Sequence, residues 1–388
     1  MGEILLDKSA AFVIDLLENG GYEAYAAGGC VRDSLLGKTP NDWDIATAAT
    51  PQQAQKLFRK MRLAVIPTGI EHGTITVVVN GQNLEVTSYR VDGGYSDGRR
   101  PDSVTFSTDI KFDLSRRDFT VNAMAYSETR GLVDLFHGRE DLANRVIRAV
   151  GNPKERFAED YLRILRAFRF AATLDFEIET ETRAAAIEMK QSVSSVSKER
   201  IRAEFEKAIV NGSPRGVTDF LVNLIGLIAP EVKDAEEAAK RVNSCERNAY
   251  ARLSALLYFC EKPDRILKNL KYDNKTIEAV SLVLSAKDFK TETKADIKRI
   301  LNKIGAENFA YFNDVTKANA QDLHNEVTQN NEPYLIKHLN ITGADIMSGL
   351  NVPAGKAVGN ALNSLLEKVI EQPELNEKEK LLHIIKGE

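Results

Sequence analysis

The sequence is poor in the residues that hold small secreted or metal-stapled domains together. Its 388 residues include three cysteines and one tryptophan. Cys30, Cys245 and Cys260 lie far apart, which suits neither a disulfide framework nor a zinc site and favours a reducing compartment. No apolar run approaches the roughly 20 residues that cross a bilayer, and the N-terminus lacks the pattern of a signal peptide. We therefore expect a cytoplasmic protein that does not interact with membranes.

The chain also lacks an excess of positive charge. Its formal net charge is −4 and its pI is about 5.9, whereas nucleic-acid-binding domains tend to be basic. Any contact with RNA must therefore come from a local cluster. The segment from Arg145 to Arg169 contains seven basic residues and three acidic ones, and this local excess focuses positive potential. The same run would also suit a helix with one solvated basic face.

The pattern of apolar residues changes along the chain. Short β-branched or aromatic runs between residues 20 and 90 predict strands, and Asn80-Gly81 predicts a tight hairpin turn. Thr50-Pro51 predicts the start of a helix over 51–61. The polar, glycine-rich segment 92–103 predicts a loop. The strands are expected at 22–27, 42–46, 74–79 and 84–89.

After about residue 139 the periodicity becomes helical almost to the end. We therefore predict an α+β protein with three parts: a sheet domain over 1–139, a helical segment over 140–211 and a further helical segment over 212–388. Residues 367–380 suggest a solvated, frayed end. Besides a helix over 5–19, the expected helices are 160–174, 179–191, 198–211, 214–227, 234–243, 252–260, 274–285, 294–304 and 355–370.

Two aspartates belong to the strand expected over 42–46. Side chains alternate along a strand, so Asp42 and Asp44 project from one face and Trp43 from the other. Two carboxylates on one face favour a divalent cation between them, and such oxygen ligands suit Mg²⁺. Two ions about 3.5–4 Å apart are a common arrangement for in-line phosphoryl transfer. An isolated Asp-x-Asp, however, usually binds no metal.

Two glycines and an Arg-Asp pair precede these aspartates. Gly28-Gly29 before a helix would let backbone N–H groups approach a triphosphate, and Arg32 can bind phosphate oxygens. A lone Gly-Gly is more often a turn. All these features lie within seventeen residues, which is far more specific than any one of them. Gly28, Gly29, Arg32 and Asp33 are therefore candidate nucleotide-binding residues.

A second stretch begins with two adjacent arginines. Arg116 and Arg117 offer planar guanidinium groups that can bind phosphate and ribose oxygens with two hydrogen bonds each. The alternative is a helix face on which these arginines pair with Asp113 or Asp118. The sequence leaves both interpretations open.

A third stretch, EDYLRILRA, contains Asp160, Arg163 and Arg166. On a helix Asp160 and Arg163 would share a face, where the alternative is an ordinary surface ion pair. Cytosine and adenine both present an amino donor beside a ring-nitrogen acceptor, which an aspartate and an arginine can match. Guanine and uracil present a carbonyl where the aspartate lies and would be repelled. The pair could thus select C and A without a nucleic-acid template. Arg166 is a further nucleotide-binding candidate.

These stretches, in this order, resemble the signature motifs of the bacterial class II tRNA nucleotidyltransferases, which are the CCA-adding enzymes and their poly(A) polymerase relatives. GG-x-VRD-x-LLG…D-x-D resembles motif A, and RRDFTVNA resembles motif B. Asp134, Gly138 and Arg148 match motif C. EDYLR resembles motif D, the amino-acid template for CTP and ATP, and residues 197–202 resemble motif E, a structural helix. The stretch 339–362 also resembles the late part of the family.

The resemblance implies a polymerase-β-like head followed by a helical neck, body and tail. It implies that Asp42 and Asp44 bind Mg²⁺, with Glu85 as a possible third carboxylate, although a strand glutamate more often faces solvent. Asp118 and Asn122 join Arg116 and Arg117 as residues that hold sugar and triphosphate.

The expected function is addition of C, C and A to the 3′ end of tRNA from CTP and ATP, with no obligatory protein partner. A CC-adding or A-adding enzyme, a poly(A) polymerase, and an inactive RNA-binding relative stay open as alternatives. No histidine is followed by aspartate, so the His-Asp phosphohydrolase domain of some relatives is not expected. The segment 90–106 is long enough to favour complete CCA addition, because CC-adding relatives have a shortened loop there.

Overall fold

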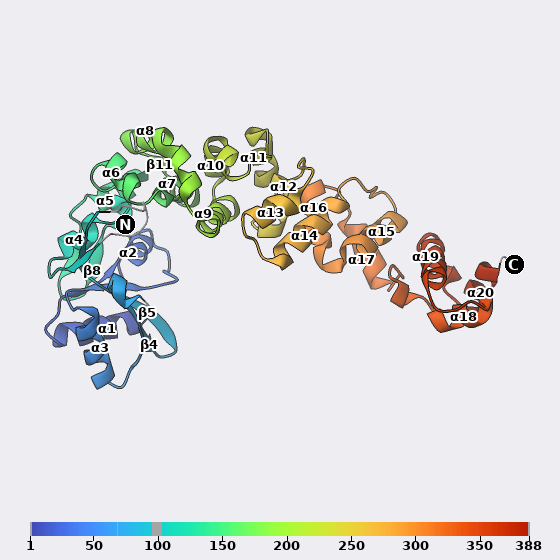
Figure 1. Ribbon diagram of the computed structural model, residues 1–388, viewed down its shortest axis with the longest axis horizontal. Coiled ribbons are helices and arrows are strands. Elements are labelled where there is room, and N and C mark those ends of the chain that lie inside the picture. The colour runs from blue at the N-terminus through green and yellow to red at the C-terminus, as the bar shows by residue number, and fades with distance from the viewer. Residues whose placement is uncertain (1, 68, 95–102, 387–388) are drawn as a thin grey trace. The chain divides into compact units, whose positions relative to one another are not determined.

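The computed structural model describes residues 2–67, 69–94 and 103–386. The chain divides into two compact units, Met1–Pro230 and Glu231–Glu388. Within the described ranges every strand belongs to the first unit and the second unit is helical (Figure 1). The expected α+β class is therefore confirmed. None of the helices in this part of the chain combines the length and the apolar character that a bilayer crossing needs.

A seven-stranded mixed sheet organises the first unit. Its strand order is β3-β4-β5-β2-β1-β8-β9. Strands β2 and β5 run parallel, and the other neighbouring pairs run antiparallel. The strands of this sheet are β1 (Ala24–Ala27), β2 (Asp44–Thr47), β3 (Ala64–Ile66), β4 (Thr74–Val79), β5 (Gln82–Ser88), β8 (Ala125–Ser127) and β9 (Gly131–Val133). Two smaller pairs are β6 (Arg90–Asp92) with β7 (Val104–Phe106), and β10 (Val146–Ile147) with β11 (Glu177–Ile178).

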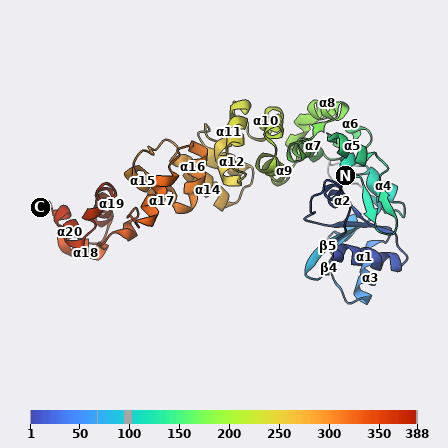
Figure 2. The same cartoon turned by 180° about the vertical axis from the view of Figure 1, so that it is seen from behind.

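The local signals in the first third of the chain are confirmed. Asn80 and Gly81 join β4 to β5 with φ values of 51° and 79°, the left-handed conformation that this turn requires. Helix α3 (Pro51–Lys60) begins with a capping box between Thr50 and Gln53. Helix α1 (Lys8–Asn19) contacts both β1 and α3, and the two helices lie side by side in both views (Figures 1 and 2). Most of the loop expected at 92–103 lies outside the described residues.

The rest of the first unit is mainly helical and packs around one long helix. Helix α7 (Leu162–Leu174) buries both faces and contacts α9 (Lys198–Asn211) and α10 (Pro214–Ile228). The remaining helices of this unit are α2 (Gly29–Leu35), α4 (Ile110–Ser115), α5 (Gly138–Asn144), α6 (Pro153–Glu159) and α8 (Thr180–Met189).

The second unit contains ten α-helices in its described part. Its last segment has a core of its own, in which Ile346, Val369 and Leu381 are almost fully buried. Residues 367–380 are therefore not the frayed end we expected: α19 continues to Glu371 and α20 packs against α18 and α19. The helices are α11 (Ala235–Ser244), α12 (Ala249–Leu256), α13 (Pro263–Asn269), α14 (Asn274–Ser285), α15 (Lys294–Ile304), α16 (Phe309–Thr316), α17 (Gln321–Gln329), α18 (Gly343–Leu350), α19 (Lys356–Glu371) and α20 (Lys378–Lys386).

Candidate active site

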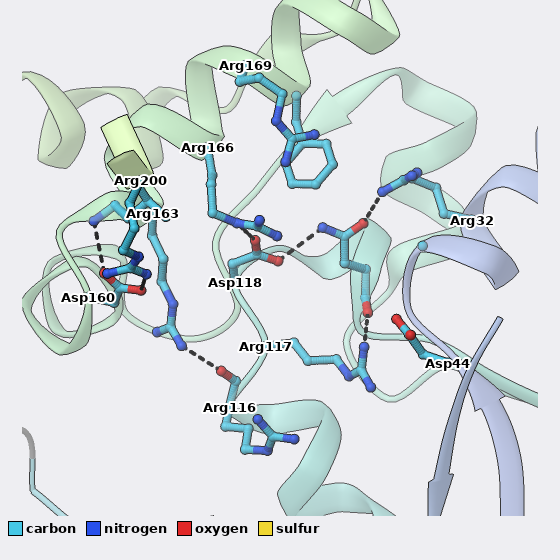
Figure 3. Close-up of a pocket in the computed structure, with 14 residues that line it drawn as sticks. Arg32, Asp44, Arg116, Arg117, Asp118, Asp160, Arg163, Arg166, Arg169 and Arg200 are labelled. Atoms are coloured by element: carbon cyan, nitrogen blue, oxygen red, sulfur yellow. Dashed lines mark hydrogen bonds and ion pairs between the residues drawn. The ribbon is translucent and has the colours of Figure 1, made fainter. Parts of the chain in front are cut away.

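A polar pocket of about 510 Å³ lies in the first unit, between the start of the central strand β2 and helix α7. Seven arginines and three aspartates line it, so its walls are strongly basic in an otherwise acidic chain. Figure 3 shows Asp44 at one end of the pocket and Asp160 with Arg200 at the other, with arginines between them. A cavity of this size and charge suits a small polyanion. Its charged residues are Arg32, Asp44, Arg116, Arg117, Asp118, Asp160, Arg163, Arg166, Arg169 and Arg200.

The carboxylate end of the pocket is built by two parallel strands. Trp43 is buried with 6% of its surface exposed, while Asp42 and Asp44 on either side of it are exposed, so the expected alternation is confirmed. The register of β2 with β5 places Glu85 directly beside Asp44. Partial burial raises the pKa of Asp44; the guanidinium of Arg117 opposes this effect, and the nearby charges of Glu85 and Asp42 add to it.

This carboxylate end fits a divalent cation by its chemistry. Oxygen is the only donor type that Asp42, Asp44 and Glu85 offer, and their mutual repulsion adds to the effect of burial in raising the pKa of Asp44. A hard cation would relieve that repulsion. Among the described residues, however, no three histidine, cysteine, aspartate or glutamate side chains stand close enough together to hold a metal ion. Asp44 lines the pocket, whereas Asp42 and Glu85 lie outside its lining.

The turn between β1 and α2 brings backbone close to a guanidinium. Gly28 has φ 88° and ψ −128°, and a Cβ at this position would lie 2.4 Å from Nη1 of Arg117. Only glycine meets both conditions without strain. Gly29 lines the pocket, as does Arg32, which donates to Oδ1 of Asn122 at 2.5 Å. Asp33 pairs with Arg32 at 2.8 Å and stands behind it, outside the pocket lining.

A fully buried carboxylate positions the two adjacent arginines. Asp113 in α4 is 0% exposed; its Oδ1 accepts from Nη2 of Arg116 at 2.5 Å, and its Oδ2 accepts from Nη2 of Arg117 at 3.1 Å. Burial alone would raise the pKa of Asp113, but the two guanidinium groups outweigh it and lower the pKa. Arg116 and Arg117 thus form the ion pairs that were the alternative interpretation, and their partner is Asp113. Both arginines nevertheless line the pocket.

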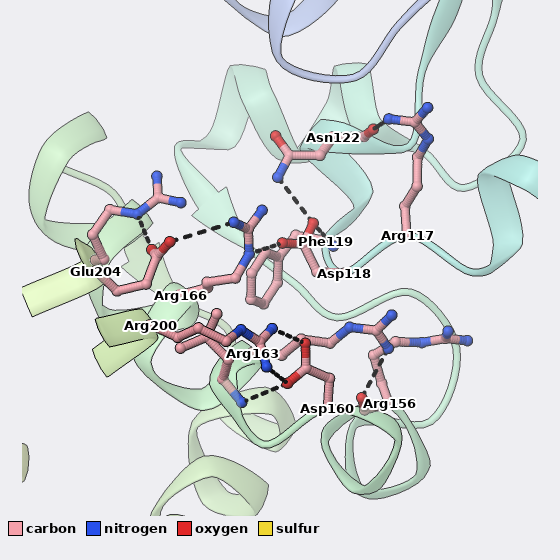
Figure 4. Close-up of polar contacts among 12 residues, drawn as sticks. Arg117, Asp118, Phe119, Asn122, Arg156, Asp160, Arg163, Arg166, Arg200 and Glu204 are labelled. Atoms are coloured by element: carbon pink, nitrogen blue, oxygen red, sulfur yellow. Dashed lines mark hydrogen bonds and ion pairs between the residues drawn. The ribbon is translucent and has the colours of Figure 1, made fainter. Parts of the chain in front are cut away.

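Asp118 joins the sheet side of the pocket to α7. Its Oδ2 accepts from Nε of Arg166 at 2.7 Å and its Oδ1 accepts from Nδ2 of Asn122 at 3.0 Å (Figure 4). Burial opposes ionisation, yet these contacts hold the pKa of Asp118 far below its usual range. Arg116, Arg117, Asp118, Asn122 and Arg166 are therefore brought together as the sequence predicts.

The structure corrects the prediction for Asp160. This residue does not share a helix face with Arg163, because α6 ends at Glu159 and Asp160 is extended, with φ −154° and ψ 105°. The two side chains also do not form the surface ion pair with each other that was the alternative interpretation. Asp160 forms an ion pair with Arg200 at 2.7 Å, and Arg163 forms one with Glu159. Both residues still line the pocket.

Comparison with known proteins agrees with this geometry. The family described as "Poly A polymerase head domain" matches residues 24–148, "Probable RNA and SrmB- binding site of polymerase A" matches 175–232, and "tRNA nucleotidyltransferase domain 2 putative" matches 243–385. The CCA-adding enzyme of Enterococcus faecalis is 36% identical over 98% of this chain and 95% of its own length. The chain belongs to the CCA-adding enzyme family. The family implies a polymerase-β-like head and the use of a divalent metal.

Two further relatives of the CCA-adding enzyme family extend the comparison over the whole chain. The CCA-adding enzyme of Pediococcus pentosaceus is 34% identical over 97% of both chains. The crystal structure of the Bacillus stearothermophilus CCA-adding enzyme in complex with CTP superposes with a TM-score of 0.82, at 30% identity, and covers 98% of this chain and 96% of that one.

Several residues of this family member line the pocket although the sequence did not predict them there: Arg169 was expected only in the basic cluster over 145–169, Arg200 only in the structural stretch 197–202, and Phe170 not at all. Arg169 and Phe170 follow Arg166 on α7, and the guanidinium of Arg169 lies 3.3 Å from the centre of the Phe170 ring. Arg200 reaches the pocket from α9. The four-residue spacing between Arg200 and Glu204 is a signal that both lie on one helix face. The sequence does not show which face of α9 turns toward the pocket.

We predict that the charge pairs of this site are lost in acid. Because the folded-state pKa of Asp118 is lowered, its stabilising contribution is present above the unfolded-state pKa of about 3.9 and disappears as the pH falls through the folded value. Asp118→Asn should therefore lower the free energy of unfolding by about 2 kcal/mol at pH 7. Denaturant titrations should show this difference shrinking below about pH 4. A difference independent of pH would contradict the assignment.

Proposed function

We propose that this chain adds C, C and A to the 3′ end of tRNA, with CTP and ATP as substrates and pyrophosphate as the product. The observation that carries the proposal is the single basic pocket that joins a carboxylate end to Asp160 and Arg163. Similarity over nearly the whole chain to enzymes named CCA-adding enzyme supports it, as does the likeness to a structure crystallised in complex with CTP.

The pocket residues suit nucleotidyl transfer. In this reaction the tRNA 3′-hydroxyl oxygen bonds to the α-phosphorus of CTP or ATP, the bond from that phosphorus to the bridging oxygen breaks, and pyrophosphate leaves. Arg32, Arg116 and Arg117 offer guanidinium donors to the triphosphate. Asn122 holds the guanidinium of Arg32, and Asp118 in turn holds Asn122. The protein contributes mainly by positioning and by compensating charge.

Magnesium is the cation we propose for the carboxylate end. Asp42 and Asp44 would hold it, with Glu85 beside them as a candidate third ligand. Bound Mg²⁺ would lower the pKa of the attacking hydroxyl and neutralise charge on the triphosphate.

Base choice falls to the opposite end of the pocket. Asp160 offers carboxylate oxygens to the amino group of cytosine or adenine, and Arg163 offers donors to the neighbouring ring acceptors. Uracil and guanine present a carbonyl oxygen to Asp160, and two acceptors repel each other. Asp160→Ala should therefore lower the preference for CTP over UTP about tenfold to a hundredfold while leaving triphosphate binding in place. An unchanged preference would rule out this template role.

We further propose that residues 1–139 form the catalytic head, 140–211 the nucleotide-selecting neck, and 212–388 the body and tail that bind tRNA. Of the seven basic residues between Arg145 and Arg169, three line the pocket, and the other four (Arg145, Arg148, Lys154 and Arg156) are the expected RNA contacts nearest to it. The free thiols of Cys30, Cys245 and Cys260 support a cytoplasmic, reducing location.

A single assay separates complete CCA addition from its alternatives. The protein is incubated with tRNA that lacks its 3′ end and with CTP, ATP or both, and product lengths are read at single-nucleotide resolution. We expect two additions with CTP alone and three with both nucleotides. Arrest after two additions with both nucleotides indicates a CC-adding enzyme, and a long adenosine tract indicates a poly(A) polymerase. The absence of any product would indicate either an A-adding enzyme or an inactive RNA-binding relative, and a second substrate, tRNA that ends in CC, separates these two because only the A-adding enzyme extends it with ATP.

A further inference from the structure

Helix α9 contacts residues of the pocket with two charged side chains of opposite sign: Arg200 lines the pocket, and Glu204 lies behind the lining, against Arg166 and Arg169. Arg200 and Glu204 are four residues apart on this helix, so they lie on one face about one turn apart. Figure 4 shows Arg200 directed at Asp160 and Glu204 directed at Arg166. The two residues therefore act on different parts of the same pocket.

Arg200 engages the carboxylate that we assign to base choice. Its Nη2 donates to Oδ2 of Asp160 at 2.7 Å, and its Nη1 donates to Oδ1 at 3.2 Å. The backbone N–H of Leu162 donates to the same Oδ1 at 3.1 Å. A planar guanidinium with two parallel hydrogen bonds fixes both the position and the plane of a carboxylate.

Asp160 needs such a partner because of where it lies in the chain. It is the extended residue between α6 and α7. Its carbonyl oxygen accepts from the backbone N–H of Arg163 at 2.9 Å, which fixes the backbone but not the plane of the carboxylate. Arg163 pairs with Glu159 and does not hold Asp160. An amino group and a carbonyl group on a base occupy nearly the same place, so an acceptor can distinguish them only if it is held still.

Glu204 contacts the arginines of α7, which connect through Asp118 and Asn122 to Arg32, an arginine that we assign to the triphosphate. It is 5% exposed and accepts from Nε of Arg169 at 2.7 Å, with Nη1 of Arg166 at 3.6 Å. Arg166 in turn holds Asp118. Loss of the Glu204 charge would leave two adjacent guanidinium groups without their shared counter-ion.

We propose that Arg200 is a specificity-determining positioning residue that holds Asp160 in the orientation that selects C and A. We propose that Glu204, one turn along α9, positions the arginines for the triphosphate of every nucleotide. The proposal rests on the proposed function, because it assumes that Asp160 contacts the base. Base choice and triphosphate binding are thus governed separately from one helix.

The test measures kcat and KM for CTP, UTP, ATP and GTP with tRNA lacking its 3′ end. We expect Arg200→Gln to lower the ratio of kcat/KM for CTP over UTP about tenfold to a hundredfold, the factor of one charge-assisted hydrogen bond. Arg200→Lys keeps the charge but not the planar group, so its ratio of kcat/KM for CTP over UTP should lie between those of the parent and Arg200→Gln. Glu204→Gln should raise KM for all four nucleotides about tenfold and leave the ratio within about twofold. Lys207→Gln removes a charge from an exposed position of α9 and should change neither the CTP-over-UTP ratio nor KM.

The ratio does not depend on the fraction of folded enzyme, so partial unfolding cannot imitate the expected result. If Arg200 acts through Asp160, the double variant Asp160→Ala/Arg200→Gln should discriminate no worse than Asp160→Ala alone. Equal loss of activity toward all four nucleotides in both Arg200 variants would overturn the proposal. If Asp160→Ala prefers CTP over UTP as strongly as the parent, the base-reading part of the proposed function fails. If Asp160→Ala loses this preference but the Arg200 variants keep it, only the further inference fails.

Discussion

Asp42→Ala and Asp44→Ala should each lower kcat/KM for addition of both CTP and ATP about a thousandfold, because a metal site contributes several kcal/mol to such a transition state. Asp44 begins β2 and Asp42 lies two residues before it, both exposed beside the buried Trp43, so loss of either would weaken the same proposed cation site. Rates would be measured with saturating tRNA over a range of Mg²⁺ concentrations. Turnover near that of the parent in either variant would eliminate the carboxylate pair as the metal site.

Two variants sharpen this experiment. Glu85→Gln keeps the shape of the residue beside Asp44 but removes its charge, so it should raise the Mg²⁺ concentration needed for half-maximal rate if Glu85 is a third ligand. Asp15→Ala removes a carboxylate from an exposed position on α1 and should leave rates and metal dependence unchanged. An effect of Asp15→Ala as large as that of Asp42→Ala would point to a general charge effect.

Asp113→Asn should impair the protein in two ways at once. The side chain is fully buried between Arg116 and Arg117, and breaking a buried ion pair typically costs about 3–5 kcal/mol. The free energy of unfolding should therefore fall by about 3 kcal/mol. Because both arginines lose their orientation, KM for CTP and ATP should rise about tenfold to a hundredfold. Denaturant titration and initial rates measure the two effects.

The matched control for Asp113 lies four residues earlier. Asp109 is the exposed N-cap of the same helix, α4, and accepts from the backbone N–H of Lys111. Asparagine is an equally good N-cap, so Asp109→Asn should change stability and KM little. If Asp113→Asn destabilises the protein but leaves KM unchanged, Asp113 is structural only and the orientation of the two arginines does not matter for substrate binding.

Local sequence signals predict the fold well where one turn or one cap decides the conformation. The Asn80-Gly81 hairpin and the Thr50-Pro51 helix start are both confirmed, because φ preferences and capping act within four residues. Short helices of the second unit, such as α16 and α18, escaped prediction because their periods are too few to show. Residues 371–380 are mostly exposed, as their charges predict, but the segment 367–380 is not frayed, because α19 continues to Glu371 and buries Val369 and Ile370.

The site is predicted as a set of residues but not as a set of contacts. The pocket brings together most of the residues that the sequence selects. The partners are another matter: Asp160 pairs with Arg200, forty positions away, and Asp118 with Arg166. Such pairs depend on how α7 and α9 dock onto the sheet domain, which no local pattern encodes. Helical periodicity also continued through Asp160, so it hid the break at which α6 ends.

The arginines of the pocket are also the counter-ions of the protein's own carboxylates. Arg116 and Arg117 neutralise Asp113, Arg166 neutralises Asp118, and Arg200 neutralises Asp160. A mutation that removes Arg166 or Arg200 therefore takes the ion-pair partner from a carboxylate, and one that removes Arg116 or Arg117 takes one of the two partners of Asp113, so each should weaken the fold as well as the reaction. A gene copy freed from selection for activity could not discard these residues one at a time without cost. Neutral drift at this pocket requires paired substitutions, which makes a stable but inactive descendant slow to arise.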